Sequence, residues 1–567
     1  MPTEIVELED RRLKRLKPAQ LARELMGLPA KRRMDLIVES PNAQAVVAAL
    51  DANDFFHTVQ EIGADDSLPL LALASIEQMN HLFDIEWWLR DTLEPAKALT
   101  WIERLWRAGG ARLAEWISNA DIELLVSLFQ QWITVDTAPE DIDLVEAVEQ
   151  LPPRTLDDFF FWESKYPQYD DLITHLLTIV FETSYGFFKE LMNNVLHASA
   201  AEVEESAYKF HCARLMDRGI PDFYDAMEIY RSMRPDEFTV EKETRRADQN
   251  EPVPLFAMAL LSEGDLFARI VSRIEDPALL ETIQAEMAAL ANKVIVADRL
   301  APDNAQALRR AVEKSLAYVN LGLELLSGAD SEKAAEIVRC GFLEHLFRIA
   351  HTEVAAIRRR LRAIVQSGWL KQCPAGPRCL DGEWFEAAEE LLAATPRVVK
   401  IRSGGNAAKE PLEFEFFRTP HDLARAARIV DVIGGAGRLH QLLGGASAWD
   451  PAQRLWTGGQ VSAPEDITLG VLVLMAAANF LISGKWAAEP LSRAAWPEIF
   501  PLLKPSAVEG AVLDWIRRTV RGEKRKSFAG AYLIPILRDY ESEMRPFSDQ
   551  NPPETHMVKF FMFSEYP

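Results

Sequence analysis

Apolar residues recur three and four positions apart along most of this chain, which is the period of an α-helix rather than a strand. The stretch from Asp303 to Gly328 shows the pattern, because its apolar residues form a single stripe of Leu308, Val312, Leu316, Val319, Leu323 and Leu326. Stripes of this kind are buried by packing helix against helix. The sequence therefore predicts an all-α fold.

Alternating apolar and polar residues, the pattern of a half-buried strand, are scarce. Arg397–Ile401 and Leu412–Phe417 alternate over a few residues, and they predict at most a minor β-hairpin near residues 397–417. Val558–Phe563 is typical of either a strand or a docking tail. We therefore expect little sheet anywhere in the chain.

The first 150 residues form a series of short helical units, of which "PNAQAVVAAL" and "SIEQMNHLFDIEWWL" are two. Each unit begins with a small or acidic residue. Ser75 with Gln78 fits a capping box, in which each side chain bonds the backbone of the other residue. Short amphipathic helices cannot bury their faces alone. The pattern predicts an N-terminal superhelix of stacked short helices, similar to an α-solenoid.

Two breaks in the helical pattern divide the chain into three predicted domains. The polar stretch Thr134–Asp158 marks the first break, and Gln366–Trp384, interrupted by Gly and Pro, marks the second. The predicted domains are the superhelix over residues 1–150, a central all-helical domain over 151–370 and a mostly helical C-terminal domain over 371–567.

The run that comes closest to a membrane-spanning helix is Ile467–Ser483. It is shorter than the roughly 20 residues that a spanning helix needs, and it contains Thr468 and Asn479. A helix that is apolar on every side is typical of the centre of a helical domain. The sequence favours a buried helix over residues 467–483. Attachment to a membrane surface, which would need Leu469–Ile482 exposed, is the alternative.

A formal net charge of −24 disfavours binding to nucleic acid and to anionic lipid. The four cysteines are too few and too scattered for a disulfide framework, and the charged amino terminus lacks the apolar core of a secretory signal. Cys373 and Cys379 flank two prolines and predict an ordinary loop with two thiols rather than a zinc site. These features predict a cytoplasmic protein.

The stretch Phe210–Tyr230 places a histidine, a cysteine and several charged residues beside a Gly-Ile-Pro turn. Its apolar residues predict a helix over residues 201–217, a corner at Gly219–Pro221 and a new helix that begins at Asp222 or at the preceding glycine turn. Polar side chains in such a corner usually form internal hydrogen bonds. The sequence favours this interpretation over a functional site.

A metal site is the alternative for the same region. Glu204 and His211 share one face of the helix over 201–217, and a helix predicted over 171–197 carries His175 and Glu182 on another shared face. Carboxylates and imidazoles can present lone pairs to one metal ion. These four residues are the candidate metal ligands if the two helices pack together.

Glycine pairs in "SGGN", "IGGAGR", "LGGAS" and "TGGQ" predict helix stops, since none follows a clear strand or ends in the Gly-Lys-Ser/Thr of a phosphate loop. The sequence also lacks the HExxH of zinc proteases and the GxSxG of serine hydrolases. We therefore predict no catalytic residue and no firmly implied cofactor. The excess of acidic residues leaves weak binding of a divalent cation possible.

Two resemblances to known families add to this interpretation. Residues 50–84, "LDANDFFHTVQEIGADDSLPLLALASIEQMNHLFD", resemble the superhelical cytosolic N-terminal domain of MgtE-type magnesium channels, which implies divalent-cation sensing. The stretches "DDFFFWESKYPQYDDLITHLL", "ARLMDRGIPDFYDAMEIY" and "LVLMAAANFLISG" resemble a family of long bacterial all-helical proteins of unknown function. The second resemblance covers most of the chain and implies a helical fold and a cytoplasmic origin, with no catalytic residue.

The sequence thus predicts a noncatalytic cytoplasmic scaffold or regulatory module that binds another protein through a helical groove. A metal-dependent enzyme with its site between residues 171–197 and 201–217 is the alternative. A protein partner is expected and nucleic-acid or membrane partners are not, while no homo-oligomeric state is favoured.

Overall fold

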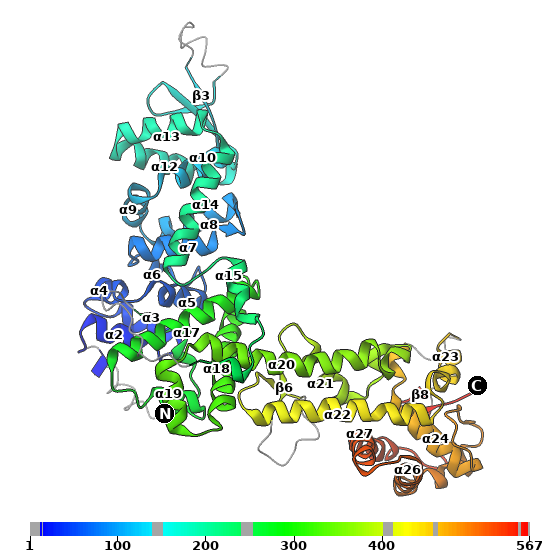
Figure 1. Cartoon of the computed structure of the whole chain (residues 1–567). Coiled ribbons are helices and arrows are strands. Elements are labelled where there is room, and N and C mark those ends of the chain that lie inside the picture. Colours follow the sequence, from blue (N-terminus) through cyan, green and yellow to red (C-terminus); the bar gives the residue numbers. More distant parts are fainter. Residues whose placement is uncertain are drawn as a thin grey trace. The chain divides into compact units, whose positions relative to one another are not determined.

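The structure, a computed structural model, describes most of the chain, in the residue ranges 12–13, 15–138, 151–239, 253–400, 412–457, 463–553 and 557–564 (Figure 1). By its internal contacts the chain divides into two compact units, Met1–Arg348 (unit 1) and Ile349–Pro567 (unit 2). Helices predominate in both, with a few small antiparallel sheets, so the predicted fold class is confirmed. The three-domain division predicted from the sequence stays a prediction.

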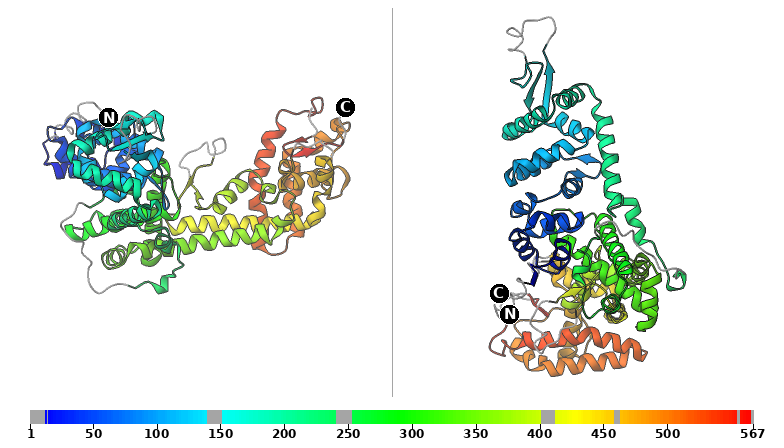
Figure 2. Two further views of the ribbon diagram at one scale, coloured as in Figure 1. Left: turned by 90° about the horizontal axis from the view of Figure 1, so that it is seen from above. Right: turned by 90° about the vertical axis from the view of Figure 1, so that its left-hand side faces the viewer.

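Unit 1 opens with a series of short helices. They are α2 (Pro18–Leu25), α3 (Ala30–Val38), α4 (Ala43–Ala48), α5 (Ala52–Ile62), α6 (Leu68–Leu71), α7 (Ile76–Glu86), α8 (Pro95–Ala108), α9 (Gly110–Asn119) and α10 (Ile122–Trp132). Several pack on helices one or two places away, as α3 does on α5, α5 on α7 and α8 on α9. Stacking on near neighbours buries the apolar face that a short helix cannot bury alone. The right-hand view of Figure 2 shows the series in blue to cyan.

Side-chain caps fix where these short helices begin. The predicted capping box is present at α7, where the Ser75 hydroxyl accepts from the Gln78 nitrogen at 3.2 Å and the Gln78 amide oxygen accepts from the Ser75 nitrogen at 3.0 Å. At α5 the Asp51 carboxylate accepts from the Asn53 nitrogen at 2.8 Å. Each cap satisfies a backbone donor that the first helical turn leaves without a partner.

Unit 1 also contains strands that the sequence analysis missed. A hairpin of β1 (Trp88–Leu89) and β2 (Thr92–Leu93) joins α7 to α8, and an antiparallel sheet has the order β3 (Ile133–Thr137), β5 (Phe160–Ser164), β4 (Arg154–Thr155). The expectation of at most one minor hairpin, near residues 397–417, is therefore wrong. Phe160, Phe161 and Trp162 are all buried, so β5 lacks the alternation that identifies a strand in a sequence.

The sheet is followed by a 3-10 turn, η1 (Pro167–Tyr169), and then by four helices. These are α12 (Asp170–Thr183), α13 (Tyr185–His197), α14 (Ala200–Asp217) and α15 (Phe223–Met227). The single helix predicted over 171–197 is wrong, because Ser184 is extended and caps α13 by accepting from the Phe187 nitrogen at 3.3 Å. The predicted corner is confirmed: Gly219 has φ +73°, and the Asp222 carboxylate caps α15. In Figures 1 and 2, α14 runs beside the short helices, and it packs on α7 and α10.

The rest of unit 1 is built on two long helices. The elements are η2 (Glu228–Tyr230), η3 (Pro235–Glu237), η4 (Met258–Leu260), α16 (Leu266–Val271), α17 (Pro277–Ala297), α18 (Ala305–Ser327) and α19 (Ser331–Cys340). The apolar stripe predicted on α18 is buried at Leu308, Val312 and Leu316. The predicted stop is also confirmed, since α18 ends at Ser327 and Gly328 adopts the left-handed conformation.

Unit 2 follows from α20 (Leu343–Gln366), which begins in the last residues of unit 1. Its elements are η5 (Trp369–Gln372), η6 (Gly376–Cys379), α21 (Gly382–Leu392), β6 (Val398–Val399), β7 (Phe414–Glu415), α22 (Pro420–Leu442), η7 (Gly445–Trp449), α23 (Asp450–Thr457), η8 (Pro464–Asp466), α24 (Leu469–Ser483), α25 (Trp496–Ile499), η9 (Phe500–Leu503), α26 (Pro505–Thr519), α27 (Glu523–Met544), β8 (Met557–Val558) and β9 (Phe561–Met562). The antiparallel pair β6–β7 is the predicted hairpin.

Helix α24 forms the centre of unit 2. Its residues from Leu469 to Ala478 are all buried, as a core helix requires, and the exposure that the membrane-surface alternative needed begins only beyond them, at Phe480 and Ile482. Among the described residues, no helix is long and apolar enough to cross a membrane. Phe561 and Phe563 at the C-terminal end pack against Trp496, so Val558–Phe563 contains a strand and also docks on the core.

The glycines of "IGGAGR" lie inside α22 and do not end a helix, so this predicted stop is wrong. Close contacts explain them: a Cβ on Gly435 would lie 2.6 Å from Phe528, and a Cβ on Gly437 would lie 2.5 Å from Trp369. The stop predicted at "LGGAS" is confirmed by the end of α22 and the positive φ of Gly444. "SGGN" and the two glycines of "TGGQ" lie outside the described residues.

A candidate binding groove in unit 1

Two of the four predicted metal ligands lie on α14 against the β1–β2 hairpin. Glu204 accepts a hydrogen bond from the Leu93 nitrogen at 3.1 Å. His211 is buried, its ring stacks on Trp88 at 4.7 Å, and its Nδ1 lies 3.5 Å from Oδ1 of Asp84. Both side chains therefore contribute to packing between α14 and the hairpin.

The other two predicted ligands lie on α12. His175 stacks on Trp106 of α8, with ring centroids 5.3 Å apart, so its contacts are with a different element from those of His211. Within the part of the chain that the structure describes, no three or more His, Cys, Asp or Glu side chains are grouped so that they could hold a metal ion. Metal ligation by His175, Glu182, Glu204 and His211 stays a prediction.

An arginine fork connects α14 to two other parts of unit 1. Arg214 donates to both carboxylate oxygens of Asp84, each at 2.7 Å, and also to Asp121, which precedes α10. Two parallel bonds from one guanidinium to one carboxylate fix both position and orientation. The fork therefore ties α14 to α7 and to the start of α10.

A polar face on α5 is the feature that the sequence analysis missed. Asp54, His57, Thr58 and Glu61 follow one another at the helical spacing i, i+3, i+4, i+7, and the first three are buried. The signal was present in "DANDFFHTVQEIG", whose polar residues share a face. Buried polar groups on a short helix require partners elsewhere in the chain.

Asp54 holds the segment that precedes η4. Its Oδ1 accepts from the Leu255 nitrogen at 2.8 Å and from the Phe256 nitrogen at 2.6 Å, and its Oδ2 accepts from the Leu255 nitrogen at 2.9 Å. Burial, reinforced by the nearby Asp51 carboxylate, raises the pKa of Asp54 to about 8, although the backbone donors oppose the shift. The carboxyl group thereby clamps the 255–256 backbone against α5.

His57 supports the same segment from one turn further along. Its ring stacks on Phe256 with centroids 3.9 Å apart. Burial, helped by the neighbouring His81 and Arg33, lowers the pKa of His57 to about 3, and burial lowers the pKa of His81 to about 4. Both imidazoles are therefore neutral at pH 7.

Arg33 of α3 reaches the polar face from the opposite side. It donates to the Thr58 hydroxyl and, at 3.2 Å, to the Leu28 carbonyl, and its Nη2 lies 3.7 Å from Oε2 of Glu61. The side chain is only 4% exposed, and among the described residues its Nε has no hydrogen-bond partner. Burial lowers the pKa of Arg33, while the Glu61 and Asp54 charges oppose that shift.

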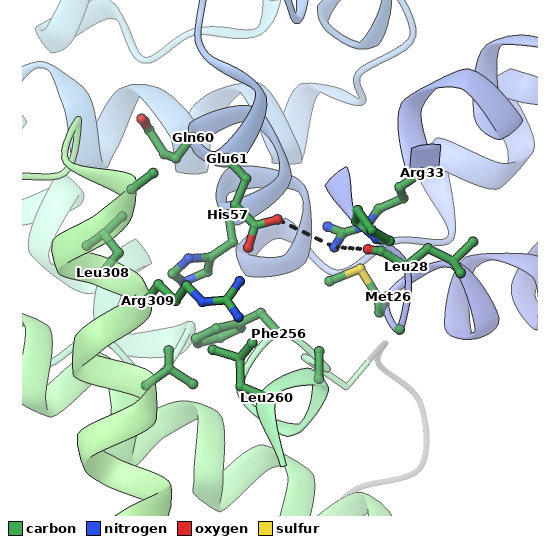
Figure 3. A pocket seen from close by; sticks show the side chains of 15 residues that line it. Met26, Leu28, Arg33, His57, Gln60, Glu61, Phe256, Leu260, Leu308 and Arg309 are labelled. Carbon is green, nitrogen blue, oxygen red and sulfur yellow. Dashed lines mark hydrogen bonds and ion pairs between the residues drawn. The ribbon is translucent and has the colours of Figure 1, made fainter. Parts of the chain in front are cut away.

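These side chains surround a cavity of about 260 Å³ (Figure 3). Its polar lining is Arg33, His57, Gln60, Glu61 and Arg309. Its apolar lining comes from the α2–α3 turn, the clamped segment together with η4, and α18, and includes Met26, Leu28, Phe256, Leu260, Leu308 and Val312. In Figure 3 the Arg309 guanidinium lies beside the His57 ring, and Arg33 approaches Glu61 from the other side.

A second cavity, of about 340 Å³, lies next to the first and shares Met26, Gly27 and Ala259 with it. Its other lining residues come from α2, the clamped segment and α17, and they are Arg23, Leu255, Met258, Pro277, Leu280, Glu281 and Gln284. Because they share lining residues, the two cavities adjoin, and we treat them together as one groove. We call it the Met26 groove.

Two other buried polar clusters line neither cavity. The Lys314 ammonium donates to Asp298 at 2.7 Å and to the Tyr230 hydroxyl at 2.6 Å. In unit 2, Asp381 accepts from the Tyr532 hydroxyl and the Gly470 nitrogen, each at 2.8 Å. Each cluster joins elements distant in sequence, which is the structural use of a satisfied polar network.

Comparison with known proteins gives one family. A family model described as "Family of unknown function (DUF6178)" matches residues 10–564. No curated protein and no solved structure matches the chain. The match agrees with the predicted resemblance to a family of unknown function, whereas the resemblance of residues 50–84 to MgtE-type domains stays a prediction.

Proposed function

Because the chain belongs to DUF6178, a family of unknown function, we propose its function from the Met26 groove: a noncatalytic interaction module that binds a short segment of a partner protein. The observation that carries the proposal is a groove whose lining combines apolar side chains, which we call its floor, exposed polar side chains, which we call its rim, and the buried polar side chains of Arg33 and His57. One wall of the groove is clamped to α5 by Asp54. Recognition of a protein segment in a groove between helices is a common mode of binding.

The floor of the groove suits apolar side chains. Met26 and Met258 line it together with leucines, and the unbranched, polarisable methionine side chain adapts to different occupants. Small apolar contacts in a concave, mostly dehydrated site supply affinity, and a few polar groups supply orientation.

The rim supplies those polar groups. Arg23 lies 3.1 Å from Glu281 across the second cavity, and Gln60 and Arg309 line the first. Charged pairs at the edge of an interface contribute little affinity but influence the rate of association and the choice of partner. The rim is therefore suited to selecting a segment that carries both apolar and polar side chains.

The clamped wall makes the groove preorganised. Leu255 and Phe256 are held by the backbone bonds to Asp54 and by the stack on His57. A wall that is ordered before binding spares the partner segment part of the entropic cost of association.

The proposal is tested by selecting a library of random dodecapeptides on the full-length protein. Ala259 is exposed and lines both cavities, so Ala259→Trp fills the groove without entering the core. Ala213→Trp on α14 is the matched control, because Ala213 is also exposed and lines neither cavity.

Peptides enriched on the wild type should bind Ala259→Trp at least tenfold more weakly and Ala213→Trp with unchanged affinity. Enriched peptides that bind all three proteins equally, or no enrichment over Ala259→Trp, would overturn the proposal.

A further inference from the structure

We propose that Cys373 and Cys379 form a modification site in unit 2, where a peroxide oxidises the two thiols to one intramolecular disulfide that restrains the segment leading to Asp381. Both cysteines are free thiols in the structure. The proposal is independent of the Met26 groove, whose lining lies in unit 1.

The backbone folds the loop "CPAGPRC" back on itself. Cys373 directly follows η5 and Cys379 is the last residue of η6, and these two 3-10 turns pack against each other. The Gly376 nitrogen donates to the Cys373 carbonyl at 3.1 Å, and Gly376 has a φ of +55°, which glycine adopts without strain. The loop therefore carries its two cysteines at its two ends, on elements that are already in contact.

The two side chains meet inside unit 2. Cys379 is 0% exposed and Cys373 is 6% exposed. The thiol of Cys373 is hydrogen-bonded to Cys379, and this bond, together with burial, raises the pKa of Cys373. The Cys373 thiol also donates to the Trp369 carbonyl at 3.5 Å, which fixes its direction. Adjacent sulfurs are what a disulfide requires first, because its two Cβ atoms lie only about 4 Å apart.

The loop between the cysteines helps the bond to close. Pro374 and Pro377 fix two of its φ angles, so the loop has few conformations to lose. Gln372, Pro374 and Arg378 are exposed, which places the loop at the surface while its sulfurs face inward. A short, stiff surface loop keeps the thiols near each other even when it opens locally to admit a small oxidant.

The reaction balances with hydrogen peroxide as the oxidant. A thiolate of the pair attacks one peroxide oxygen, the O–O bond breaks, and a sulfenic acid and one water form. The other sulfur then attacks the sulfenic sulfur, and its proton leaves with the displaced hydroxyl as a second water while the S–S bond forms. The two sulfurs lose the two electrons that the peroxide gains.

The loop leads into the buried cluster around Asp381. The Asp381 nitrogen donates to the Tyr532 hydroxyl at 3.2 Å, and the Asp381 carboxylate accepts from the Tyr532 hydroxyl and the Gly470 nitrogen, each at 2.8 Å. A disulfide removes conformations from the opened loop and thereby favours its closed state. Oxidation should therefore slow amide hydrogen exchange in residues 369–381.

The test uses trypsin, because cleavage after Lys371, Arg378 and Arg397 places the two cysteines on adjacent peptides, 372–378 and 379–397. The folded full-length protein is treated with hydrogen peroxide at alkaline pH, since the thiolate is the reacting form and the pKa of Cys373 is raised. Remaining thiols are blocked with N-ethylmaleimide, and the digest is analysed by mass spectrometry without reduction.

The matched variants are Cys379→Ser, which removes one member of the pair, and Cys340→Ser, which removes a thiol on α19 and keeps the pair. Thermal unfolding checks that each variant folds. The linked peptides identify both cysteines directly, so the wild-type digest decides the proposal even if Cys379→Ser does not fold.

We expect peptides 372–378 and 379–397 to be linked in the oxidised wild type and in Cys340→Ser, to separate on treatment with dithiothreitol, and to be unlinked in Cys379→Ser. Exchange in residues 369–381 should slow severalfold in the linked protein. N-ethylmaleimide adducts on both cysteines after peroxide treatment, sulfinic acid at either one, or a link from either to Cys212 or Cys340 would overturn the proposed disulfide. Unchanged exchange in the linked protein would overturn the restraint on the segment leading to Asp381.

Discussion

The Asp54 carboxylate accepts a hydrogen bond from the Phe256 backbone nitrogen at 2.6 Å, although 202 positions of sequence separate the two residues. This contact joins the series of short helices to the segment that forms a wall of the Met26 groove. Loss of this acceptor should therefore increase local opening at residues 255–256 before it affects other parts of the protein.

Asp54→Ala should accelerate amide hydrogen exchange in a peptide covering residues 253–260. Removing the acceptor leaves the buried Phe256 donor and the partly buried Leu255 donor unsatisfied, at a cost of about 1–3 kcal/mol, which corresponds to roughly 5- to 150-fold in local opening. Exchange is measured by mass spectrometry. Asp222→Ala is the control, because Asp222 also accepts from two backbone nitrogens, those of Tyr224 and Asp225. An unchanged exchange rate in Asp54→Ala would contradict the clamp.

Asp54 should also make stability fall as the pH rises. Its pKa is about 8 in the folded protein against 3.8 in the unfolded chain, so between these values the folded state keeps a proton that the unfolded state releases. The stabilising contribution is complete below pH 3.8 and is lost as the pH rises through about 8. Asp54→Asn, which is neutral throughout, should show a smaller loss of unfolding free energy between pH 6 and 9. Parallel pH profiles of the two proteins in urea unfolding would count against this assignment.

His81 should make stability fall as the pH is lowered, which is the opposite pH dependence to that of Asp54. Burial lowers its pKa from 6.5 to about 4, so the unfolded chain takes up a proton that the folded protein refuses. Stability is therefore lost as the pH falls from about 6.5 toward 4. The free energy of unfolding in urea should therefore fall less steeply between pH 6.5 and 4 in His81→Gln than in the wild type. His197→Gln, at an exposed position on α13, should show the same fall as the wild type. If the unfolding free energy falls with the same slope in both variants, His81 is not the group that causes the fall.

Gly437→Ala should destabilise unit 2 although alanine favours helices. A Cβ at Gly437 would lie 2.5 Å from Trp369, whose Nε1 donates to the Ile433 carbonyl at 2.9 Å. Overpacking of this kind costs about 1–3 kcal/mol, against a gain of at most about 1 kcal/mol in helix propensity. Gly510→Ala on α26 is the control, because a Cβ there meets no atom within 4 Å, and it should stabilise slightly. Equal shifts in thermal midpoint would refute the close contact.

The sequence predicted the features whose chemistry is local. The capping box of Ser75 and Gln78, the stop at Gly328 and the corner at Gly219 each depend on residues a few positions apart. The Asp54 clamp depends on Phe256, and the need for glycine at position 437 depends on Trp369. No sequence periodicity connects the members of either pair. The strand β5 was missed for a related reason, since burial of consecutive residues is decided by the elements that cover the sheet.

The Arg214 fork limits how this series of helices can change in evolution. One guanidinium holds Asp84 at the end of α7 and Asp121 before α10, and the chain between them forms α8 and α9. A helix inserted or deleted within residues 85–120 would move one carboxylate away from the guanidinium and leave a charged group without its counterion. Relatives that lengthen or shorten the series should therefore do so outside this interval.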